Sequence, residues 1–302
     1  MRWKKVDGGD DVIDARGSSP TASGPGMGGI PIPIGKAGGG LGLIIAIIVI
    51  GMQLLGSGSG SGFDVSQAFP SSTAVSDSRA EGIPEDQDPE KDFKDFSSYV
   101  FVTAQQGWQQ AFAQSGKQYD KAKLYIYRNG VNTGGCGSAS SAVGPFYCPG
   151  DQRVYIDLSF YKLMQQQLGA SGDVAWGYVI AHELGHHVQQ QLGTEAQVRK
   201  LQQQNPSEAN ELSVRMELQA DCYAGIWAHR VFQQGDLEDG DIDEAIGAAQ
   251  AVGDDTLQRN SGQGVHPESF THGTSAQRAK WFKTGYESGE PAQCDTFQTD
   301  NV

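Results

Sequence analysis

The chain has 302 residues, which is enough for one large domain or two ordinary ones, and 38% of them are apolar, so a core can form. It carries 22 Lys and Arg against 36 Asp and Glu, a formal net charge of −14 at pH 7. A surface this acidic repels phosphate backbones, and nucleic acid is therefore excluded as an expected partner.

The first third of the chain shows two compositions. Residues 1–36 are rich in Gly, Pro and Ser without a sustained hydrophobic period, which predicts a disordered segment. Residues 37–56 contain the uncharged run GGLGLIIAIIVIGMQLL, close to the ~20 residues that a transmembrane helix needs. A late signal peptide and a buried soluble helix are the alternatives. Lys and Arg concentrate before the run, so the positive-inside rule predicts a cytoplasmic N-terminus and an extracytoplasmic remainder.

The rest of the chain divides into a tether and a domain. Residues 57–90 are polar and rich in Gly and Ser, which predicts a flexible tether, and residues 91–302 form the expected domain. Hydrophobic periods predict helices from Phe93 onward and at 159–168, 173–192, 210–230, 241–252 and 274–286. Strands are predicted at 123–128 and 154–158, and the Gly/Ser loop between them favours a small antiparallel sheet. The expected fold class is α+β, mainly α.

Helix-ending signals support two of these elements. Gly193 is expected to end the long helix at 173–192, with Ser171 or Asp173 as its N-cap. Thr271 or Thr274 is the expected N-cap of the last helix.

Four cysteines lie in the expected domain, namely Cys136, Cys148, Cys222 and Cys294. Pairing is expected in an oxidising space outside the cytoplasm. We favour Cys136–Cys148 because it closes a short loop, which leaves Cys222–Cys294. A cysteine metal site is the alternative, but the chain has no CxxC spacing.

The stretch AHELGHHVQQQ, residues 181–191, carries the most specific chemical signal. His182 and His186 are four residues apart, so on a helix both imidazoles face one side and can reach one metal ion. Glu183 lies one position round and can act as a base toward water activated by zinc. Two surface histidines are the alternative, but the apolar run AWGYVIA before the motif favours a buried site.

A third ligand is expected on a later helix. A third histidine six residues after His186 is excluded, because that position is Leu192. Glu217 and Asp221 in MELQAD are again four residues apart, on a mostly apolar helix where carboxylates need partners. Glu217 is the expected ligand, with Asp221 binding the far nitrogen of a ligand histidine; Asp221 as the ligand is the alternative.

Other histidines receive lesser roles. His187 lies ~100° round the helix from His186 and is not expected to bind the same metal. His272, in a Thr-His-Gly turn before a helix, is our candidate donor to a tetrahedral oxyanion, and Tyr223 is the second candidate. An ordinary N-cap region is the alternative for His272.

Together these segments resemble the neutral zinc metallopeptidase family of YpfJ-like, membrane-anchored bacterial proteins. The resemblance covers nearly the whole chain and rests on MRWKK, GCGSASSAVGPFYCPGDQRVYIDLSF, AHELGHHVQ, ELQADCYAG and HGTSAQRAKWF. It implies a zincin-like helical domain at the bacterial inner membrane, with zinc held by His182, His186 and Glu217, and Glu183 as base. The pair His272 and Arg278 is also similar to a segment of the CAAX-type and heat-shock membrane zinc proteases, where it lies near the metal.

The function expected from the sequence is a zinc-dependent peptidase acting on peptides or proteins on the extracytoplasmic (periplasmic) side of the membrane. A zinc amidase acting on cell-wall peptides and a non-catalytic zinc-stabilised envelope scaffold are the alternatives. A scaffold has no use for a base such as Glu183 beside an open coordination position. No particular oligomeric state is predicted.

Overall fold

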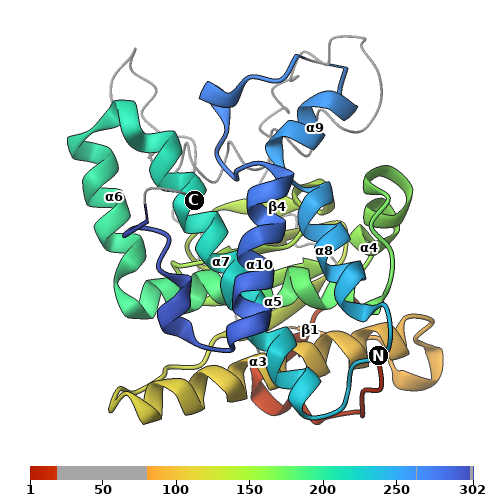
Figure 1. The fold of residues 1–302 in the computed structure, drawn as a ribbon. Helices are drawn as coiled ribbons and strands as arrows, with labels where there is room; N and C mark the ends of the chain where they lie inside the picture. Colours follow the sequence, from red (N-terminus) through yellow and green to blue (C-terminus); the bar gives the residue numbers. More distant parts are fainter. Residues whose placement is uncertain (19–79, 263, 300–301) are drawn as a thin grey trace.

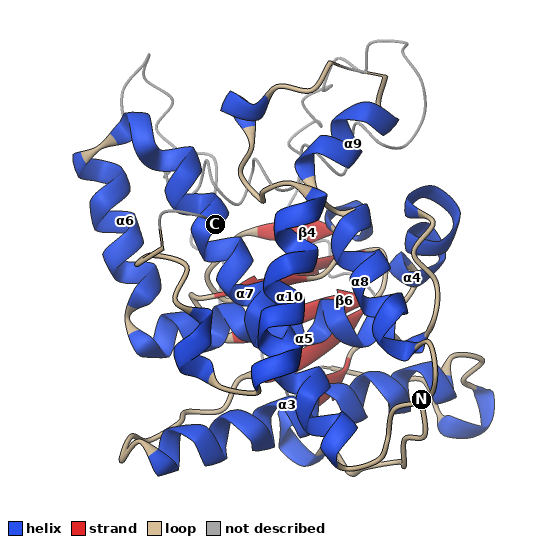
Figure 2. Cartoon of the chain, in the orientation of Figure 1, coloured by secondary structure: helices blue, strands red, loops and turns tan. Residues whose placement is uncertain are grey.

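Helix α5 (Asp173–Leu192) is the central element of the fold in this computed structural model. It packs against α3 (Lys91–Gln114), α7 (Ala209–Gln233) and α8 (Asp241–Ala251), and it also contacts the sheet. Helix α10 (Ser275–Ser288) lies along α7 and α8, in front of the strands (Figures 1 and 2). The structure describes residues 1–18, 80–262, 264–299 and 302.

The main sheet has the strand order β1-β2-β6-β5. Strands β1 (Val12–Asp14), β2 (Lys123–Tyr127) and β6 (Arg153–Asp157) run parallel, and only β5 (Phe146–Cys148) is antiparallel to its neighbour. A separate hairpin joins β3 (Gly130–Asn132) and β4 (Ser138–Ser140).

The prediction of a small antiparallel sheet is therefore wrong for its two central strands. The segment between β2 and β6 is not a simple hairpin loop, because it contains the β3–β4 hairpin and then β5, which returns along β6. That segment is long enough for the crossover that parallel neighbours require. Four of the five residues in each central strand are buried, as is typical of parallel strands covered on both faces.

The long helices agree with the sequence prediction, but the N-cap of α5 is Gly172 rather than Ser171 or Asp173, and no side chain caps this end. Helix α5 ends at Gly193, whose φ of +79° is the left-handed conformation that glycine adopts without strain. Thr274 caps α10 in a capping box with Gln277. The helices α6 (Thr194–Gln204) and α9 (Asp254–Asn260) were not predicted, because each buries a single apolar residue and shows little hydrophobic period.

Helices α7 and α10 approach each other closely through two glycines. A Cβ atom on Gly225 would lie 2.1 Å from the carbonyl oxygen of Phe282, and one on Gly285 would lie 1.9 Å from that of Cys222. Backbone therefore contacts backbone at this crossing, which brings the side chains of α10 within reach of those on α7.

Residues 1–18 fold with the domain, so the prediction of disorder is wrong for this part of 1–36. Strand β1 extends the sheet beside β2, with Ile13 opposite Tyr125. The Arg16 side chain is fully buried and forms ion pairs with Asp14, Asp88 and Glu90. The sequence signal was weak because the apolar residues of this segment are few and all their partners are distant: Ile13 lies opposite Tyr125, and Trp3 packs against Phe96 and Tyr99 on α3.

The predicted membrane topology is also corrected. Among the residues that the structure describes, none of the helices combines the length and apolar character needed to cross a bilayer. The predicted span at 37–56 lies outside the described residues. A single span would put residues 1–18 and the domain on opposite sides of a membrane, yet Gly17 donates to the carbonyl of Glu81 and Arg16 pairs with Asp88. The fold class is thus mainly helical with small sheets, and the single-pass inner-membrane location is not supported.

Two disulfides tie the fold together. Cys136 is bonded to Cys148, and Cys222 on α7 is bonded to Cys294 near the end of the chain, which confirms the favoured pairing.

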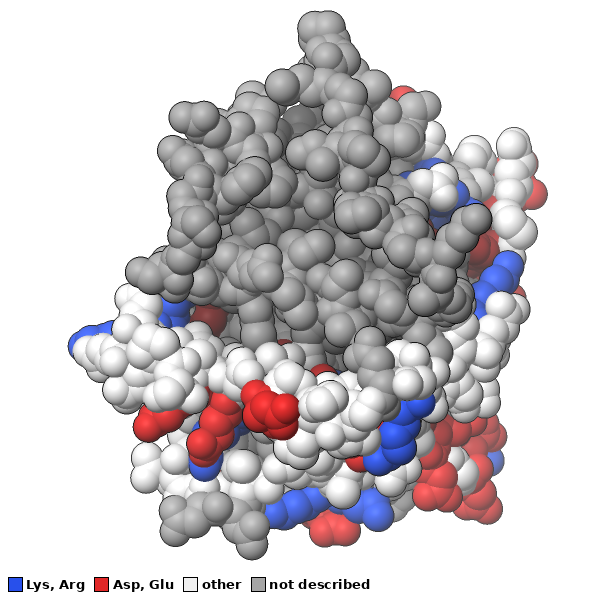
Figure 3. All heavy atoms as spheres, turned by 90° about the horizontal axis from the view of Figure 1, so that it is seen from above, with Lys and Arg blue, Asp and Glu red and all other residues white. Residues whose placement is uncertain are grey.

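On the face seen in Figure 3, acidic and basic side chains are interspersed over the described surface, and acidic ones gather at one edge.

Candidate metal centre

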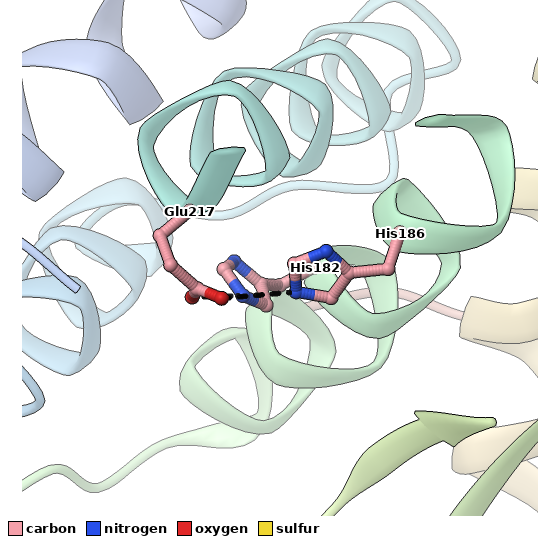
Figure 4. A group of neighbouring side chains, drawn as sticks. All are labelled: His182, His186 and Glu217. Atoms are coloured by element: carbon pink, nitrogen blue, oxygen red, sulfur yellow. Dashed lines mark ion pairs between the residues drawn. The ribbon is translucent and has the colours of Figure 1, made fainter. Parts of the chain in front are cut away.

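Three side chains from two helices converge at the centre of the fold. His182 and His186 extend from one face of α5 toward Glu217 on α7 (Figure 4). Nε2 of His182 lies 3.2 Å from Oε2 of Glu217, and Nε2 of His186 lies 3.5 Å from Oε1. One ligand atom from each of the three residues lies within 4.8 Å of the others.

These residues fit a zinc ion. Two imidazole nitrogens and one carboxylate form a common catalytic zinc set, and bond lengths of about 2.0–2.2 Å in a tetrahedron put ligand atoms roughly 3.3 Å apart. The observed separations of 3.2 and 3.5 Å match this. In both histidines Nδ1 is bound to a side-chain oxygen, so Nε2 is the nitrogen directed at Glu217.

Glu183 lies beside this group without belonging to it. It is absent from the sets of described side chains close enough to share one ion. Burial raises the pKa of its carboxyl group, while His186, His182 and the backbone N–H of Tyr147 act in the opposite direction. The net effect is a raised pKa, which makes Glu183 a stronger base than an exposed glutamate.

The far nitrogen of His182 is held by a buried charged network. Nδ1 lies 2.9 Å from Oδ1 of Asp221, which also accepts a hydrogen bond of 2.6 Å from Tyr178. Arg278 donates to both carboxylate oxygens of Asp221, at 2.8 and 2.9 Å. Burial opposes the charged form of His182, but Asp221 and Glu217 outweigh it and raise the pKa of His182 to about 10.

The charges of this network also act on its carboxylates. Burial favours the neutral form of Asp221, but Arg278 and His182 hold the pKa of Asp221 below its usual value. The pKa of Glu217 is likewise held well below its usual value, against burial, by His186, His182 and His272. Both carboxylates are therefore anionic at neutral pH, as a cation site requires.

The far nitrogen of His186 has a neutral partner. Nδ1 lies 2.8 Å from Oε1 of Gln189, one turn further along α5. The Gln189 side chain is completely buried. The two histidines are therefore oriented by groups of different charge.

His272 lies in the turn before α10 and is buried beside an acidic residue. Asp254, at the start of α9, is 3.1 Å from Nδ1 of His272 and accepts hydrogen bonds from the backbone N–H groups of Thr271, His272 and Gly273. His272 is one of the three histidines that hold the pKa of Glu217 below its usual value.

Two other residues considered from the sequence lie elsewhere. The Tyr223 ring packs edge-on against Trp108, with centroids 4.8 Å apart, and is buried in the core. His187 bonds through Nδ1 to the hydroxyl of Tyr147 and through Nε2 to the carbonyl of Asp120, as a residue that does not bind the metal should. Burial lowers the pKa of His187, so it is neutral at pH 7.

Sequence reasoning missed three residues of this centre. Tyr178 and Gln189 lie four residues before His182 and three after His186, so helical spacing on the ligand face could have identified both. Asp254 gives no comparable signal, because it meets His272 only through the packing of α9 on the turn before α10.

Comparison with known proteins identifies the family of the chain. The family model described as "Putative neutral zinc metallopeptidase" matches residues 1–297, and the chain therefore belongs to this family, whose metal is zinc. "Uncharacterized protein YpfJ" of Escherichia coli (strain K12) is 59% identical over 203 residues, covering 67% of this chain and 70% of that protein. "Uncharacterized protein Mb2605" of Mycobacterium bovis is 45% identical over 195 residues, which are 61% of this chain and 65% of that protein. No solved structure matches the chain significantly.

Proposed function

We propose that this protein is a zinc-dependent peptidase that hydrolyses peptide bonds with an activated water molecule. His182, His186 and Glu217 would hold the metal, and Glu183 would act as the general base. The observation that carries the proposal is the convergence of both Nε2 atoms on Glu217, at 3.2 and 3.5 Å, with Glu183 adjacent.

The chemistry follows from the environment of each side chain. When bound, zinc acts as a Lewis acid that lowers the pKa of a water molecule to about 7 and polarises a carbonyl group. Glu183 accepts a proton from the water and, because burial raises its pKa, retains that proton until it is donated to the leaving amine. Asp221 and Gln189 keep the imidazole rings in place during this exchange.

His272 is the proposed donor to the tetrahedral oxyanion. The Asp254 carboxylate accepts from Nδ1–H, so Nε2 would donate a hydrogen bond to the developing negative charge in the imidazolium form of the ring, which carries a proton on both nitrogens. In this role Asp254 is a positioning residue, because it acts only through His272.

Cleavage of an unfolded protein such as casein tests the proposal. The zinc-loaded full chain should cut casein, and Glu183→Gln should reduce kcat by about 10²- to 10⁴-fold, the usual range for general acid–base catalysis. The Gln variant should bind zinc like the wild type, since Glu183 is not a proposed ligand. The base assignment fails if the variant keeps full activity.

A wild type that holds zinc but cuts neither casein nor other unfolded proteins would contradict the peptidase proposal. Purified cell-wall peptides should be assayed beside casein, and cleavage of these alone would identify an amidase. Zinc content must be measured in every sample, so that missing metal is not mistaken for missing chemistry.

A further inference from the structure

Gln189 does more than contact His186. Its Nε2 donates to the backbone carbonyl of Met216 at 2.8 Å and to Oε1 of Gln219 at 3.1 Å. Gln219 in turn donates from Nε2 to the carbonyl of Cys294 at 3.0 Å. Gln189 and Gln219 are both buried, so water does not compete for these bonds.

These hydrogen bonds form a series from Cys294 through Gln219 and Gln189 to His186, and the carbonyl of Cys294 fixes the direction of each of them. A backbone carbonyl can only accept, so Gln219 must present Nε2 to Cys294 and Oε1 to Gln189. Gln189 must then present Nε2 to Gln219, and the carbonyl of Met216 imposes the same orientation. Oε1 of Gln189 consequently faces His186, and it accepts only if the imidazole proton is on Nδ1.

We propose that Gln189 is a positioning residue of the metal centre, which selects the tautomer of His186 that leaves Nε2 free to bind zinc. Gln219 and the carbonyl of Cys294 set the orientation of Gln189. This inference rests on the proposed zinc site and adds a neutral counterpart to the Asp221 support of His182.

The disulfide Cys222–Cys294 holds in place the carbonyl group of Cys294, at which this series of hydrogen bonds ends. It joins Cys294 to α7, the helix that also carries Gln219 and Glu217. The donor at Gln219 and its acceptor at Cys294 are therefore held together covalently. The second disulfide, Cys136–Cys148, lies in the β3–β5 region and contains no residue of this series of hydrogen bonds.

Zinc affinity, measured by competition with a chromophoric chelator, tests the role of Gln189. Gln189→Leu should bind zinc about 10- to 100-fold more weakly, the usual cost of losing the partner of a ligand histidine. Gln189→Glu retains an acceptor toward His186 and should recover part of this loss. Gln190→Leu is the matched control: it removes an amide one residue further along α5, where the partners are Tyr147 and Pro149, and zinc affinity should not change.

Changes at Gln219 and at the Cys222–Cys294 disulfide should have smaller effects on zinc affinity. Gln219→Leu should weaken zinc binding less than Gln189→Leu, because the carbonyl of Met216 still holds the Gln189 amide. Replacing Cys222 and Cys294 by Ser should weaken zinc binding measurably, though no more than Gln219→Leu does, whereas the same change at Cys136 and Cys148 should leave the zinc affinity of the folded protein unchanged. Equal losses from both disulfide pairs would overturn the proposed link to Cys294.

The tautomer can be observed directly. Long-range ¹H–¹⁵N correlations of the zinc-loaded wild type should show the His186 proton on Nδ1 and the metal on Nε2. Metal on Nδ1, or unchanged zinc affinity in Gln189→Leu, would overturn the inference. Failure of the wild type to bind zinc would instead contradict the proposed function. Glu217→Ala distinguishes the two failures: it should lose zinc whatever the role of Gln189, so if it does while Gln189→Leu binds zinc normally, only the role of Gln189 is wrong.

Discussion

The two histidines proposed to bind zinc lie one turn apart on the same helix, yet opposite kinds of support hold them. Behind His182 is a charged network of Asp221, Arg278 and Tyr178, in which Asp221 is fully buried. Behind His186 is the neutral amide of Gln189, oriented by Gln219 and two backbone carbonyls. Both arrangements present Nε2 to Glu217.

This difference shows that orienting a ligand and stabilising its charge are separable tasks. An amide acceptor fixes a tautomer without adding charge, whereas a carboxylate also stabilises a protonated imidazole. Burying Asp221 requires Arg278 as a partner, because an unpaired buried carboxylate is costly. The two sides should therefore respond differently to substitution, to pH and to metal.

The largest effect is expected from breaking the charged side. Asp221→Ala removes the close partner of the buried Arg278 guanidinium and leaves it only the more distant carboxylate of Glu217, at 3.8 Å, so the free energy of unfolding should fall by about 3–5 kcal/mol. Urea denaturation with a chelator present measures this. The double variant Asp221→Leu with Arg278→Met removes both charges and should recover part of the loss; additive losses would show that the two residues do not act as a pair.

Breaking the neutral side should cost less. Gln189→Leu leaves hydrogen-bonding groups of His186, Met216 and Gln219 unpaired in the interior, for which about 1–3 kcal/mol of unfolding free energy is expected. The same urea experiment applies, with Gln190→Leu as the matched control. A loss as large as that of Asp221→Ala would remove the distinction between the two sides.

The smallest effect, and the most specific, is on pH dependence. His182, with a pKa of about 10 in the metal-free protein, holds a proton at pH 7.5 that zinc must displace. Zinc affinity should therefore rise about tenfold per pH unit up to that pKa, a step worth roughly 1.4 kcal/mol. Calorimetry in buffers of different ionisation enthalpy should detect the released proton.

The same shift affects folding in the opposite direction. Because the folded pKa of His182 is raised, its stabilisation of the metal-free protein is fully present below the unfolded value of about 6.5 and is lost as pH rises toward 10. Asp221→Asn should remove most of this dependence, whereas Gln189→Leu should leave it intact. An unchanged pH profile in Asp221→Asn would contradict the assigned cause of the shift.

Sequence and structure agree where local spacing decides the outcome. Two pairs are spaced four residues apart, His182 with His186 on α5 and Glu217 with Asp221 on α7. The helical period alone therefore places each pair on one face of its helix. Gln189 has the same spacing advantage but no charge to attract notice. Asp254 was not found because its contact with His272 depends on the packing of two separate elements.

The fold predictions failed where distant segments decide the outcome. Strands β2 and β6 were predicted, but not that they run parallel to each other. They can do so because the segment between them forms β5, which pairs with the other edge of β6. Residues 1–18 are held by distant partners: β1 pairs with β2, Trp3 packs on Phe96, and Arg16 is buried against Asp88, 72 residues away. Neither relation leaves a periodic trace in the sequence.

The proposed zinc site is tested most directly by the zinc content of three purified chains after dialysis: wild type, Glu217→Ala and Glu211→Ala. Glu211 lies on the same helix but pairs with Arg215 at the surface, so its removal controls for the loss of a carboxylate on α7. We expect one zinc per chain in the wild type and in Glu211→Ala, and almost none in Glu217→Ala. Full zinc content in Glu217→Ala would contradict the proposed His182, His186 and Glu217 site.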